Sequence, residues 1–416
     1  MAKTISHIVK RPGRLPGEPD VEIPIAEDLV TVPGSPTRER DVSFYSREYP
    51  IETQNIEKAA DREWGWTIYT PEVLEYRKGH DVANKPLIDA AAVSGDIPPT
   101  VSPEAGLDVT DSIRAKATDL GFGEVGFTKY DRHYTFESKK KWARFSSAIC
   151  LALEQDYDQT QTIPSLEAEY AHFGTYEIAG AIALELAAHI RSLGYHAQVH
   201  SPNDNSGIYI PLFVAAGLGQ LGANGQLLSP HFGSRARLLI ITTDAKVTHD
   251  EPIDYGINKF CDTCQVCVDR CPARALVKDR VWWRGTHKNK LIYDRCRPVM
   301  VTYEGCAICM KVCPIQKFGM PEVMQHYVET GEVKGKGTEE LEGYDLRGKG
   351  HFGPGELPHM GKEIFEFPHG TQTDWLVTQF KEKLAANGGP ETEDAVEFAE
   401  KLNVLVGRGD DAQSDE

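Results

Sequence analysis

The chain has 416 residues, of which 40% are hydrophobic and 26% charged, and this length suits two or three globular domains. Its formal net charge is −17, which argues against nucleic acid or an anionic membrane surface as the main partner, because both attract basic faces. No run approaches the ~18 apolar residues of a membrane-spanning helix, and no apolar stretch follows the basic N-terminal residues. We therefore expect a cytoplasmic protein without an export signal.

The first 105 residues are rich in proline and charge and show little periodicity. They predict a segment that wraps around the rest of the chain with short helices. The next elements expected are a helix over 112–120, strands over 124–129 and 146–153, a helix over 175–193 and a strand over 196–200. Cys150 lies in an apolar run and is expected to be a buried strand residue.

A turn-rich loop at 201–207 is followed by an apolar stretch, 208–221, that predicts a helix, and by a β-branched stretch, 236–243, that predicts a strand. Alternating helices and strands predict an α/β (α+β) core. The domain organisation expected is a wrapping segment over 1–105, the core over 106–250, a cysteine-rich domain over 251–320 and an extension over 321–416. That extension contains a predicted helix at 373–386 and an acidic tail.

The segment from Gly217 to Gly222 fits the G-x-G-x-x-G pattern of dinucleotide-binding sites. That pattern requires a strand before it and an acidic residue about 20 positions later, and neither is expected here. A dinucleotide is therefore not expected. The glycines could still let a bulky cofactor approach the backbone closely.

Eight of the nine cysteines lie between 261 and 313. The first four follow C-x2-C-x2-C-x3-C-P, the bacterial ferredoxin pattern, and a second run ends in the same way but has a displaced first cysteine, Cys296. In such pairs, the fourth cysteine of one run binds the cluster of the other run. We predict two [4Fe-4S] clusters, one held by Cys261, Cys264, Cys267 and Cys313 and the other by Cys271, Cys296, Cys306 and Cys309.

Two other uses of these cysteines are less consistent with the pattern. A disulfide framework is unexpected in a long cytoplasmic chain, and zinc does not account for two C-x3-C-P endings. Residues 259–317 also contain twelve Lys and Arg against five Asp and Glu, although the whole chain is acidic. This local charge of +7 would offset two anionic clusters, or serve as a solvated face or a docking patch for an acidic electron donor.

In this order, the motifs resemble those of the reductive dehalogenases, which are cobalamin-dependent iron–sulfur enzymes, and more distantly those of epoxyqueuosine reductase. The resemblance covers roughly 110–320 and rests on Thr175-Tyr176, the Asn203-Asp204 loop, the glycine-rich segment 216–225, the segment His231 to Arg237 and both cysteine runs. It implies a nitroreductase-like core that holds base-off cobalamin, followed by a two-[4Fe-4S] ferredoxin-like domain. The chain shows no D-x-H-x-x-G pattern, so no protein ligand to cobalt is expected.

In that family, a tyrosine donates a proton to the substrate carbon, and a basic and a polar residue stand near it. The matching positions are Tyr176 for the tyrosine, Asn203 for the polar residue, and Arg235 for the base, with Arg237 close behind. Independently, a guanidinium beside a tyrosine stabilises the phenolate, so such a pair suits protonation of a carbanion-like carbon. Each residue also has a structural interpretation, as core packing, a turn or a surface ion pair.

The residues expected to contact cobalamin lie in the polar loop, the glycine-rich segment and the loop after it: Asn203, Gly217, Leu218, Gly219, Gly222, Asn224, Gly225 and His231. His231 could instead cap a turn. These assignments follow from the resemblance.

The resemblance implies a reductive dehalogenase in which electrons pass through the clusters to Co(I) cobalamin and halide leaves an organohalide. By analogy with the cytoplasmic branch, the expected substrates are halogenated phenols or other aryl halides. No fused reductase is recognisable, so a separate reductase, ferredoxin or flavodoxin is the expected electron donor, and a homodimer stays open. The alternatives are an epoxyqueuosine-reductase-like enzyme acting on tRNA, which the charge disfavours, and an iron–sulfur protein that only transfers electrons.

Overall fold

A four-stranded antiparallel sheet forms the centre of the computed structural model, which describes residues 5–11, 13, 17–29, 71–135, 139–201, 206–283, 286–289, 291–361 and 364. In sheet order its strands are β3 (Glu124–Lys129), β4 (Ser147–Glu154), β8 (Ala236–Thr243) and β5 (Ala197–His200). All four were predicted, and each is confirmed to within a residue or two. Because every pairing is antiparallel, the mixed fold is of the α+β kind.

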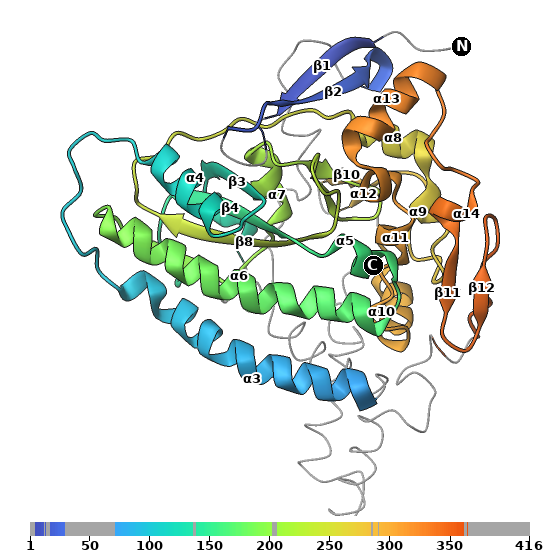
Figure 1. Ribbon diagram of the computed structural model, residues 1–416, viewed down its shortest axis with the longest axis horizontal. Helices are drawn as coiled ribbons and strands as arrows, with labels where there is room; N and C mark the ends of the chain where they lie inside the picture. The colour runs from blue at the N-terminus through green and yellow to red at the C-terminus, as the bar shows by residue number, and fades with distance from the viewer. Residues whose placement is uncertain are drawn as a thin grey trace, which may run out of the picture.

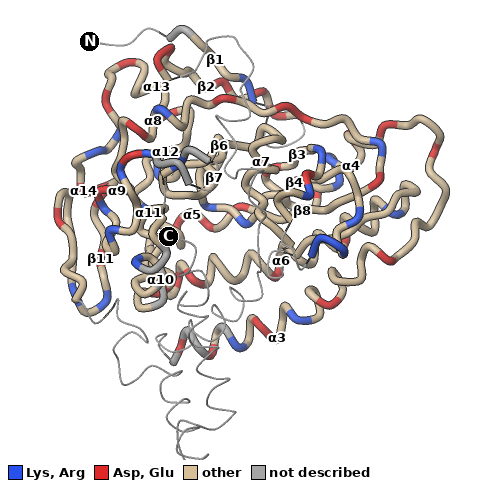
Figure 2. The backbone as a smooth tube through the Cα atoms, turned by 180° about the vertical axis from the view of Figure 1, so that it is seen from behind, with Lys and Arg blue, Asp and Glu red and all other residues tan. Residues whose placement is uncertain are grey.

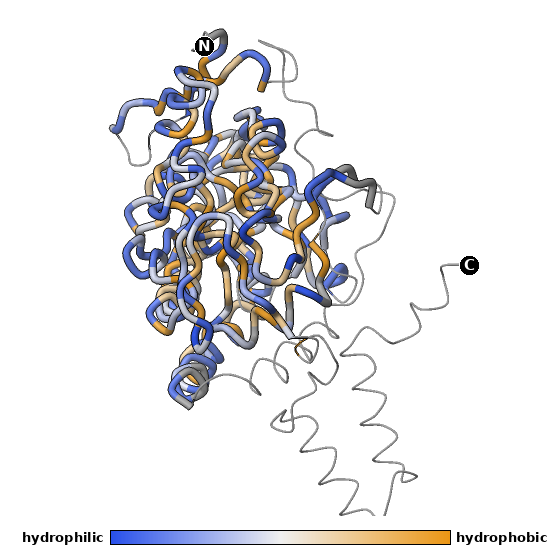
Figure 3. The backbone as a smooth tube through the Cα atoms, turned by 90° about the vertical axis from the view of Figure 1, so that its right-hand side faces the viewer, coloured by the Kyte–Doolittle hydropathy of each residue, from blue (hydrophilic) through white to orange (hydrophobic). Residues whose placement is uncertain are grey.

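Alternation along the strands divides the core between the two faces of the sheet. In β4, Ile149 and Leu151 contribute to one hydrophobic cluster, whereas Ala148, Cys150 and Ala152 contribute to the other. The first face is covered by α4 (Thr110–Asp119) and α6 (Leu166–Ser192), with α3 (Pro71–Val93) lying alongside α6 (Figure 1). The second face is covered by α7 (Ile210–Ala215). Hydrophobic segments run through the interior, and hydrophilic ones mostly form the outer loops (Figure 3).

Helix α6 is longer than predicted, and its buried face includes most of the predicted apolar stripe. It begins at Leu166, nine residues before the predicted range, and Ser165 caps it with a hydroxyl that accepts a hydrogen bond from the Ala168 amide at 3.1 Å. The large apolar residues predict a stripe that begins at Ile178, yet this side chain is 55% exposed. Leu186 and Ile190 of this stripe are buried against the sheet, and small residues such as Ala179 and Ala183 also face it, since they let the helix approach closely.

The helix predicted over 208–221 is wrong in its second half. Helix α7 ends at Ala215, and Gly217 follows with a φ of 69°, a conformation that glycine adopts at little cost. The chain then forms a two-stranded hairpin of β6 (Gln220–Leu221) and β7 (Leu227–Leu228). An apolar composition alone does not distinguish a buried hairpin from a buried helix.

The N-terminal part contains more regular structure than the predicted short helices. Strands β1 (Ile5–Arg11) and β2 (Val21–Ala26) form a hairpin that packs on α13, and α3 runs for 23 residues. Short elements complete this half of the chain: η1 (Glu27–Leu29), η2 (Ser94–Asp96), η3 (Arg132–Tyr134) and α5 (Tyr157–Gln161).

The cysteine runs lie on short helices that share one core with the residues after them. In chain order the elements are α8 (Ile257–Cys264), α9 (Val266–Asp269), β9 (Val281–Trp283), β10 (Thr286–Lys288), α10 (Tyr293–Thr302), α11 (Ile308–Lys311), α12 (Pro314–Phe318), α13 (Met320–Thr330), α14 (Glu339–Glu342), β11 (Tyr344–Leu346) and β12 (Gly350–Phe352). Charges of both signs are interspersed along this half (Figure 2). The predicted helix at 373–386 and the acidic tail lie outside the described residues.

Within the described part of the chain, no helix has the length and apolar character needed to cross a membrane.

Candidate active site

A cavity with about 940 Å³ of empty space, part of it open to solvent, lies where α6, the hairpin β6–β7, strand β8 and α11 meet. Its polar side chains come from segments far apart in the sequence: Gln155, Tyr176, Tyr209, Gln226, Ser234 and Arg237. Its apolar walls include Ile208, Leu227, Leu238 and Met310. A cavity of this size, mostly apolar with a few convergent polar groups, is typical of a ligand site.

Tyr176 and Arg237 meet in this cavity. Tyr176 lies on α6, Arg237 is the second residue of β8, and the guanidinium carbon lies 4.7 Å from the centroid of the tyrosine ring. A cation over an aromatic face is attracted by the ring and also stabilises negative charge that develops on it. The arrangement therefore suits a tyrosine that gives up its proton.

Arg235 has a different environment from Arg237. Its guanidinium lies 2.8 Å from Glu154 Oε1, donates to the carbonyls of Phe232 and Gln316, and lies over the ring of Tyr157. Burial lowers the pKa of Arg235, and the neighbouring Tyr157 opposes this shift. Of the two arginines matched to the basic residue, the structure therefore brings Arg237 to Tyr176 and ties Arg235 to the protein framework.

Three buried polar atoms at the cavity have no hydrogen-bond partner within the described part of the chain. They are Gln226 Oε1, Ser234 Oγ and Arg237 Nε. Leaving a buried polar group without a partner costs about 1–3 kcal/mol, so such atoms bond to a water, an ion or a ligand. None of Gln226, Ser234, Tyr209 and Met310 was predicted. Gln226 and Met310 directly follow predicted residues, and Ser234 lies between two of them.

The polar loop that carries Asn203 lies outside the described residues, but its two ends are described. His200 before it and Ser206 after it are hydrogen-bonded to each other, and His200 Nε2 also lies 3.0 Å from Thr242 Oγ1. Burial lowers the pKa of His200 to about 3, so its ring is neutral at physiological pH. Ser206 also lies 3.3 Å from the hydroxyl of Tyr209, which lines the cavity.

The glycine-rich segment shapes the hairpin next to the cavity. Gly225 adopts a φ of 78° in its turn, and a Cβ at Gly219 would lie 2.4 Å from the Leu228 carbonyl oxygen, so both positions favour glycine. Leu218 is fully buried in the core. His231, whose side chain is 8% exposed, lies with Nε2 4.0 Å from Glu124 Oε1. That these residues contact a cofactor stays a prediction.

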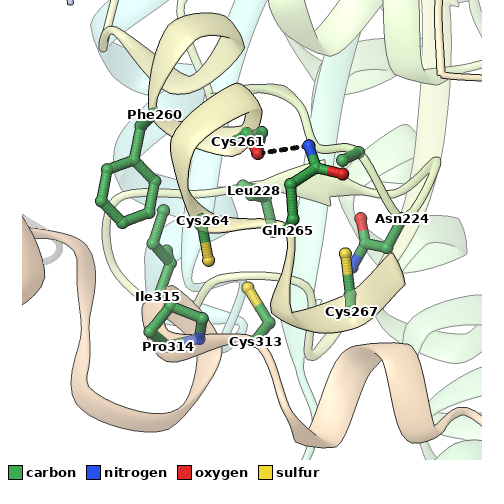
Figure 4. Close-up of a pocket in the computed structure, with 11 residues that line it drawn as sticks. Asn224, Leu228, Phe260, Cys261, Cys264, Gln265, Cys267, Cys313, Pro314 and Ile315 are labelled. Atoms are coloured by element: carbon green, nitrogen blue, oxygen red, sulfur yellow. Dashed lines mark hydrogen bonds between the residues drawn. The ribbon is translucent and has the colours of Figure 1, made fainter. Parts of the chain in front are cut away.

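One face of the same hairpin adjoins the first group of cysteines. Cys261, Cys264, Cys267 and Cys313 line one small pocket together with Asn224 and Leu228 (Figure 4). Gln265 stabilises this turn by donating its side-chain amide to the Cys261 carbonyl at 2.8 Å. Apart from the thiols and the amides of Asn224 and Gln265, the pocket is apolar, and burial raises the pKa of Cys261 to about 12. Such thiols release their protons when a metal binds, because the metal takes over the thiolate charge.

The second group consists of Cys271, Cys296, Cys306 and Cys309. Burial raises the pKa of Cys309, and repulsion from the other three members of the group adds to the effect. Burial likewise raises the pKa of Cys306 to about 12, and repulsion from Cys296 and Cys271 adds to this effect. Cys306 has a positive φ of 50°. The displaced Cys296 thus lies with the other three.

Within the described residues, no three His, Cys, Asp or Glu side chains converge on a single metal ion. A cubane presents its ligated irons at separate corners, so its cysteines are spread further apart than those around one ion.

The cavity and the cysteine groups are neighbours. Met310 lines the cavity and directly follows Cys309 on α11. The hairpin β6–β7 contributes Gln226 and Leu227 to the cavity, and Asn224 and Leu228 to the first cysteine pocket. The cavity and the cysteine groups therefore share the hairpin β6–β7 and α11 as walls.

No family model matches the chain. The tetrachloroethene reductive dehalogenase of Dehalobacter restrictus (strain DSM 9455 / PER-K23) is 36% identical over 203 residues, covering 44% of this chain and 36% of that protein. That of Sulfurospirillum multivorans is 29% identical over 181 residues, covering 41% and 36%. The epoxyqueuosine reductase of Lactococcus garvieae (strain Lg2) is 35% identical over 122 residues, covering 27% and 34%. The chain thus spans about a third of the length of these curated relatives.

Two solved structures share the fold over most of the chain. The catabolic reductive dehalogenase NpRdhA superposes with a TM-score of 0.60 at 22% identity, covering 72% of this chain and 46% of that one. A reductive dehalogenase studied for B12-dependent dehalogenation superposes with a TM-score of 0.62 at 21% identity, covering 81% and 54%. Part of the sequence is therefore similar to reductive dehalogenases and to epoxyqueuosine reductase, and the fold is similar to that of reductive dehalogenases.

Proposed function

We propose that this protein is a reductive dehalogenase, which replaces the halogen of an organohalide with hydrogen. The reaction consumes two electrons and one proton and releases halide. The observation that carries the proposal is the placement of Arg237 over the ring of Tyr176, in a cavity that Met310 connects to the cysteine segment.

Cobalamin is the cofactor that we propose binds at this cavity. Its corrin ring has an apolar face and a rim of amide groups, which match the apolar walls and the three buried polar atoms without partners. Gln226 and Ser234 would bind amide groups, and Leu227 and Met310 would pack on the ring. We propose that it binds base-off, without a ligand from the protein.

The two cysteine groups would each hold a [4Fe-4S] cluster in a ferredoxin-like arrangement. Both offer four thiols, which is the ligand set of a cubane. When bound, cobalamin supplies the low-valent cobalt that breaks the carbon–halogen bond, and the clusters supply the electrons that reduce it. A separate reductase, ferredoxin or flavodoxin would deliver these electrons.

Tyr176 would supply the proton. A tyrosine hydroxyl is a weak acid, so it holds its proton until a strongly basic carbon develops beside it. The positive charge of Arg237 then stabilises the phenolate left behind. Asn203, in the loop anchored by His200 and Ser206, would hold the substrate or cofactor by hydrogen bonds.

We propose aryl halides, halogenated phenols above all, as the substrate class. The rings of Tyr176 and Tyr209 in the cavity suit stacking with an aromatic substrate. NpRdhA, which shares the fold, has been solved in complex with 3-bromo-4-hydroxybenzoic acid. The curated dehalogenase relatives instead act on tetrachloroethene, so chlorinated ethenes are the competing substrate class.

The test is an anaerobic assay of protein reconstituted with iron, sulfide and cobalamin, with a low-potential dye as electron donor. Release of bromide or chloride from a halogenated phenol is the expected result, and release from tetrachloroethene alone would overturn the substrate class. Reduction of epoxyqueuosine in tRNA, without halide release, would favour the alternative enzyme. If the protein transfers electrons but binds no cobalamin, its function would be that of an iron–sulfur electron carrier.

A further inference from the structure

A lysine from a distant loop contacts the helix that carries the first cysteines. Lys336 Nζ donates a hydrogen bond to the main-chain carbonyl of Cys264 at 2.6 Å, across 72 residues of sequence. Cys264 is the last residue of α8, and the last carbonyls of a helix have no partner within it and carry partial negative charge. The Lys336 ammonium group is therefore held against the main chain of one member of the first cysteine group, which consists of Cys261, Cys264, Cys267 and Cys313.

The backbone on both sides of Lys336 is held in place. Gly335 and Gly337 adopt φ values of 73° and 79°, a conformation that favours glycine. A Cβ at Gly335 would lie 2.8 Å from the ring of Phe318, so the loop packs closely on this side chain. The Gly337 amide donates a hydrogen bond to Glu342 Oε1 at 2.7 Å. The position of the lysine is therefore set by the fold.

The charge of Lys336 is not cancelled by a described carboxylate. Within the part of the chain that the structure describes, Lys336 forms no ion pair. Lys334, two positions earlier in the same loop, has its Nζ 2.8 Å from Glu322 Oε1, and Glu342 Oε2 lies 3.8 Å from Arg270 Nε. The loop thus contains one lysine that is paired and one that is directed at Cys264.

A [4Fe-4S] cluster at the first cysteine group would respond to this charge. A cluster with four thiolates is an anion, and its reduction adds one electron and therefore one more negative charge. A nearby positive charge stabilises the reduced form more than the oxidised form, which raises the reduction potential. Charge and hydrogen bonding around a cluster are among the features by which a protein sets this potential.

We propose that Lys336 raises the reduction potential of the cluster that the first cysteine group would hold, so that the electron donor can reduce it. The donor loses one electron and the cluster gains it, and no covalent bond forms or breaks in this step. Lys336 is not a catalytic residue, because it acts on the cluster through Cys264. The inference rests on the two clusters of the proposed function.

The test is a redox titration, followed by EPR, of protein reconstituted with iron, sulfide and cobalamin. Cys296→Ser, which should perturb only the second cluster, identifies the signal of the first. In Lys336→Met, the ratio of reduced to oxidised first cluster at a fixed potential should fall by about three- to tenfold, which is ~30–60 mV for a one-electron couple. Lys336 is exposed, and screening by water keeps the effect within this range. The second cluster should titrate as before.

Two further variants separate the charge from the structure. Lys336→Arg keeps the positive charge, so its titration should match that of the unsubstituted protein. Lys334→Met is the matched control, because it makes the same substitution in the same loop at a lysine that Glu322 already pairs. It should shift neither cluster. Thermal unfolding of each variant measures what the hydrogen bond to α8 contributes to stability.

An unchanged potential of the first cluster in Lys336→Met would overturn the proposal, even in a less stable variant, because the lysine would then only cap α8. Equal shifts in Lys336→Met and Lys336→Arg, or in Lys336→Met and Lys334→Met, would also contradict it. If the unsubstituted protein assembles no cluster at the first cysteine group, the proposed function fails. Halide release by Lys336→Met at an unchanged potential would leave that function in place and remove only the role of Lys336.

Discussion

The Asn224 side chain donates a hydrogen bond to the main-chain carbonyl of Cys309 at 3.4 Å. This contact joins the hairpin β6–β7 to α11, across 85 residues of sequence. Cys309 belongs to the second cysteine group, and Met310 beside it lines the cavity, while Asn224 lines the pocket of the first group. This hydrogen bond therefore fixes the positions of three sites relative to one another: the cavity and both cysteine groups.

The assignment of Cys296 can be tested by substitution. We expect about eight irons per chain after reconstitution. Cys296→Ser should lower the iron content and perturb only the EPR signal of the cluster that also uses Cys271, Cys306 and Cys309. Cys150→Ser, at the cysteine in the sheet, is the control and should leave both signals unchanged. Two intact signals in Cys296→Ser would remove this ligand from the assignment.

Tyr176→Phe removes the acidic hydroxyl and keeps the ring that packs under Arg237. Turnover should fall by about 10²–10⁴-fold, the usual contribution of a positioned acid. Substrate binding should change by no more than the ~0.5–1.5 kcal/mol of one hydrogen bond. Halide release and cobalamin content are measured together. Full activity at normal cobalamin content would exclude Tyr176 as the proton donor.

The two arginines should respond differently to the same substitution. Arg237→Met should lower turnover with little loss of stability, because it leaves the phenolate of Tyr176 unstabilised. Its effect should be largely absent in a Tyr176→Phe background, since the two residues act together. Arg235→Met should instead lower the free energy of unfolding by about 1–3 kcal/mol, because Glu154 loses its partner.

Denaturant unfolding and halide release separate these outcomes. The opposite pattern, with Arg235→Met stable but inactive and Arg237→Met active, would show that the basic residue of the mechanism is Arg235.

Arg270 should protect the second cluster. Its side chain is 1% exposed and donates to the main-chain carbonyls of Glu342, Phe352 and Glu356, and its guanidinium lies 4.7 Å from the centroid of Tyr344. These bonds hold the segment around β11 and β12 over the cysteines. Burial raises the pKa of Tyr344 to about 12, and the positive charge of Arg270 opposes this increase. Repulsion from Cys306 and Cys271, both of the second group, adds to the increase.

Arg270→Met should lower the free energy of unfolding by about 3 kcal/mol or more, because several buried carbonyls lose a charged donor. The second cluster should also lose its EPR signal faster in air than the first. Lys85→Met is the control, because the side chains of Lys85 and Asp89 are 73% and 63% exposed and their ion pair should contribute less than about 1 kcal/mol. Equal air sensitivity of both clusters in Arg270→Met would contradict the protective role.

The sequence by itself determined the strands of the central sheet, the long helix that carries Tyr176 and the two cysteine runs. These features depend on interactions between residues close in sequence: side-chain alternation in a strand, helical periodicity, and the reach of neighbouring thiolates around one cluster. Short-range geometry of this kind is visible in a pattern of residue types.

Only the tertiary structure decided which arginine lies over Tyr176. Arg235 and Arg237 are two positions apart, on either side of Ala236, the first residue of β8. Because of this start, Arg235 meets Glu154 and Arg237 enters the cavity. Likewise, Gln226 and Met310 become neighbours of Tyr176 only when a hairpin and a helix from distant parts of the chain pack together. Such contacts depend on the packing of whole elements, which residue spacing along the chain does not record.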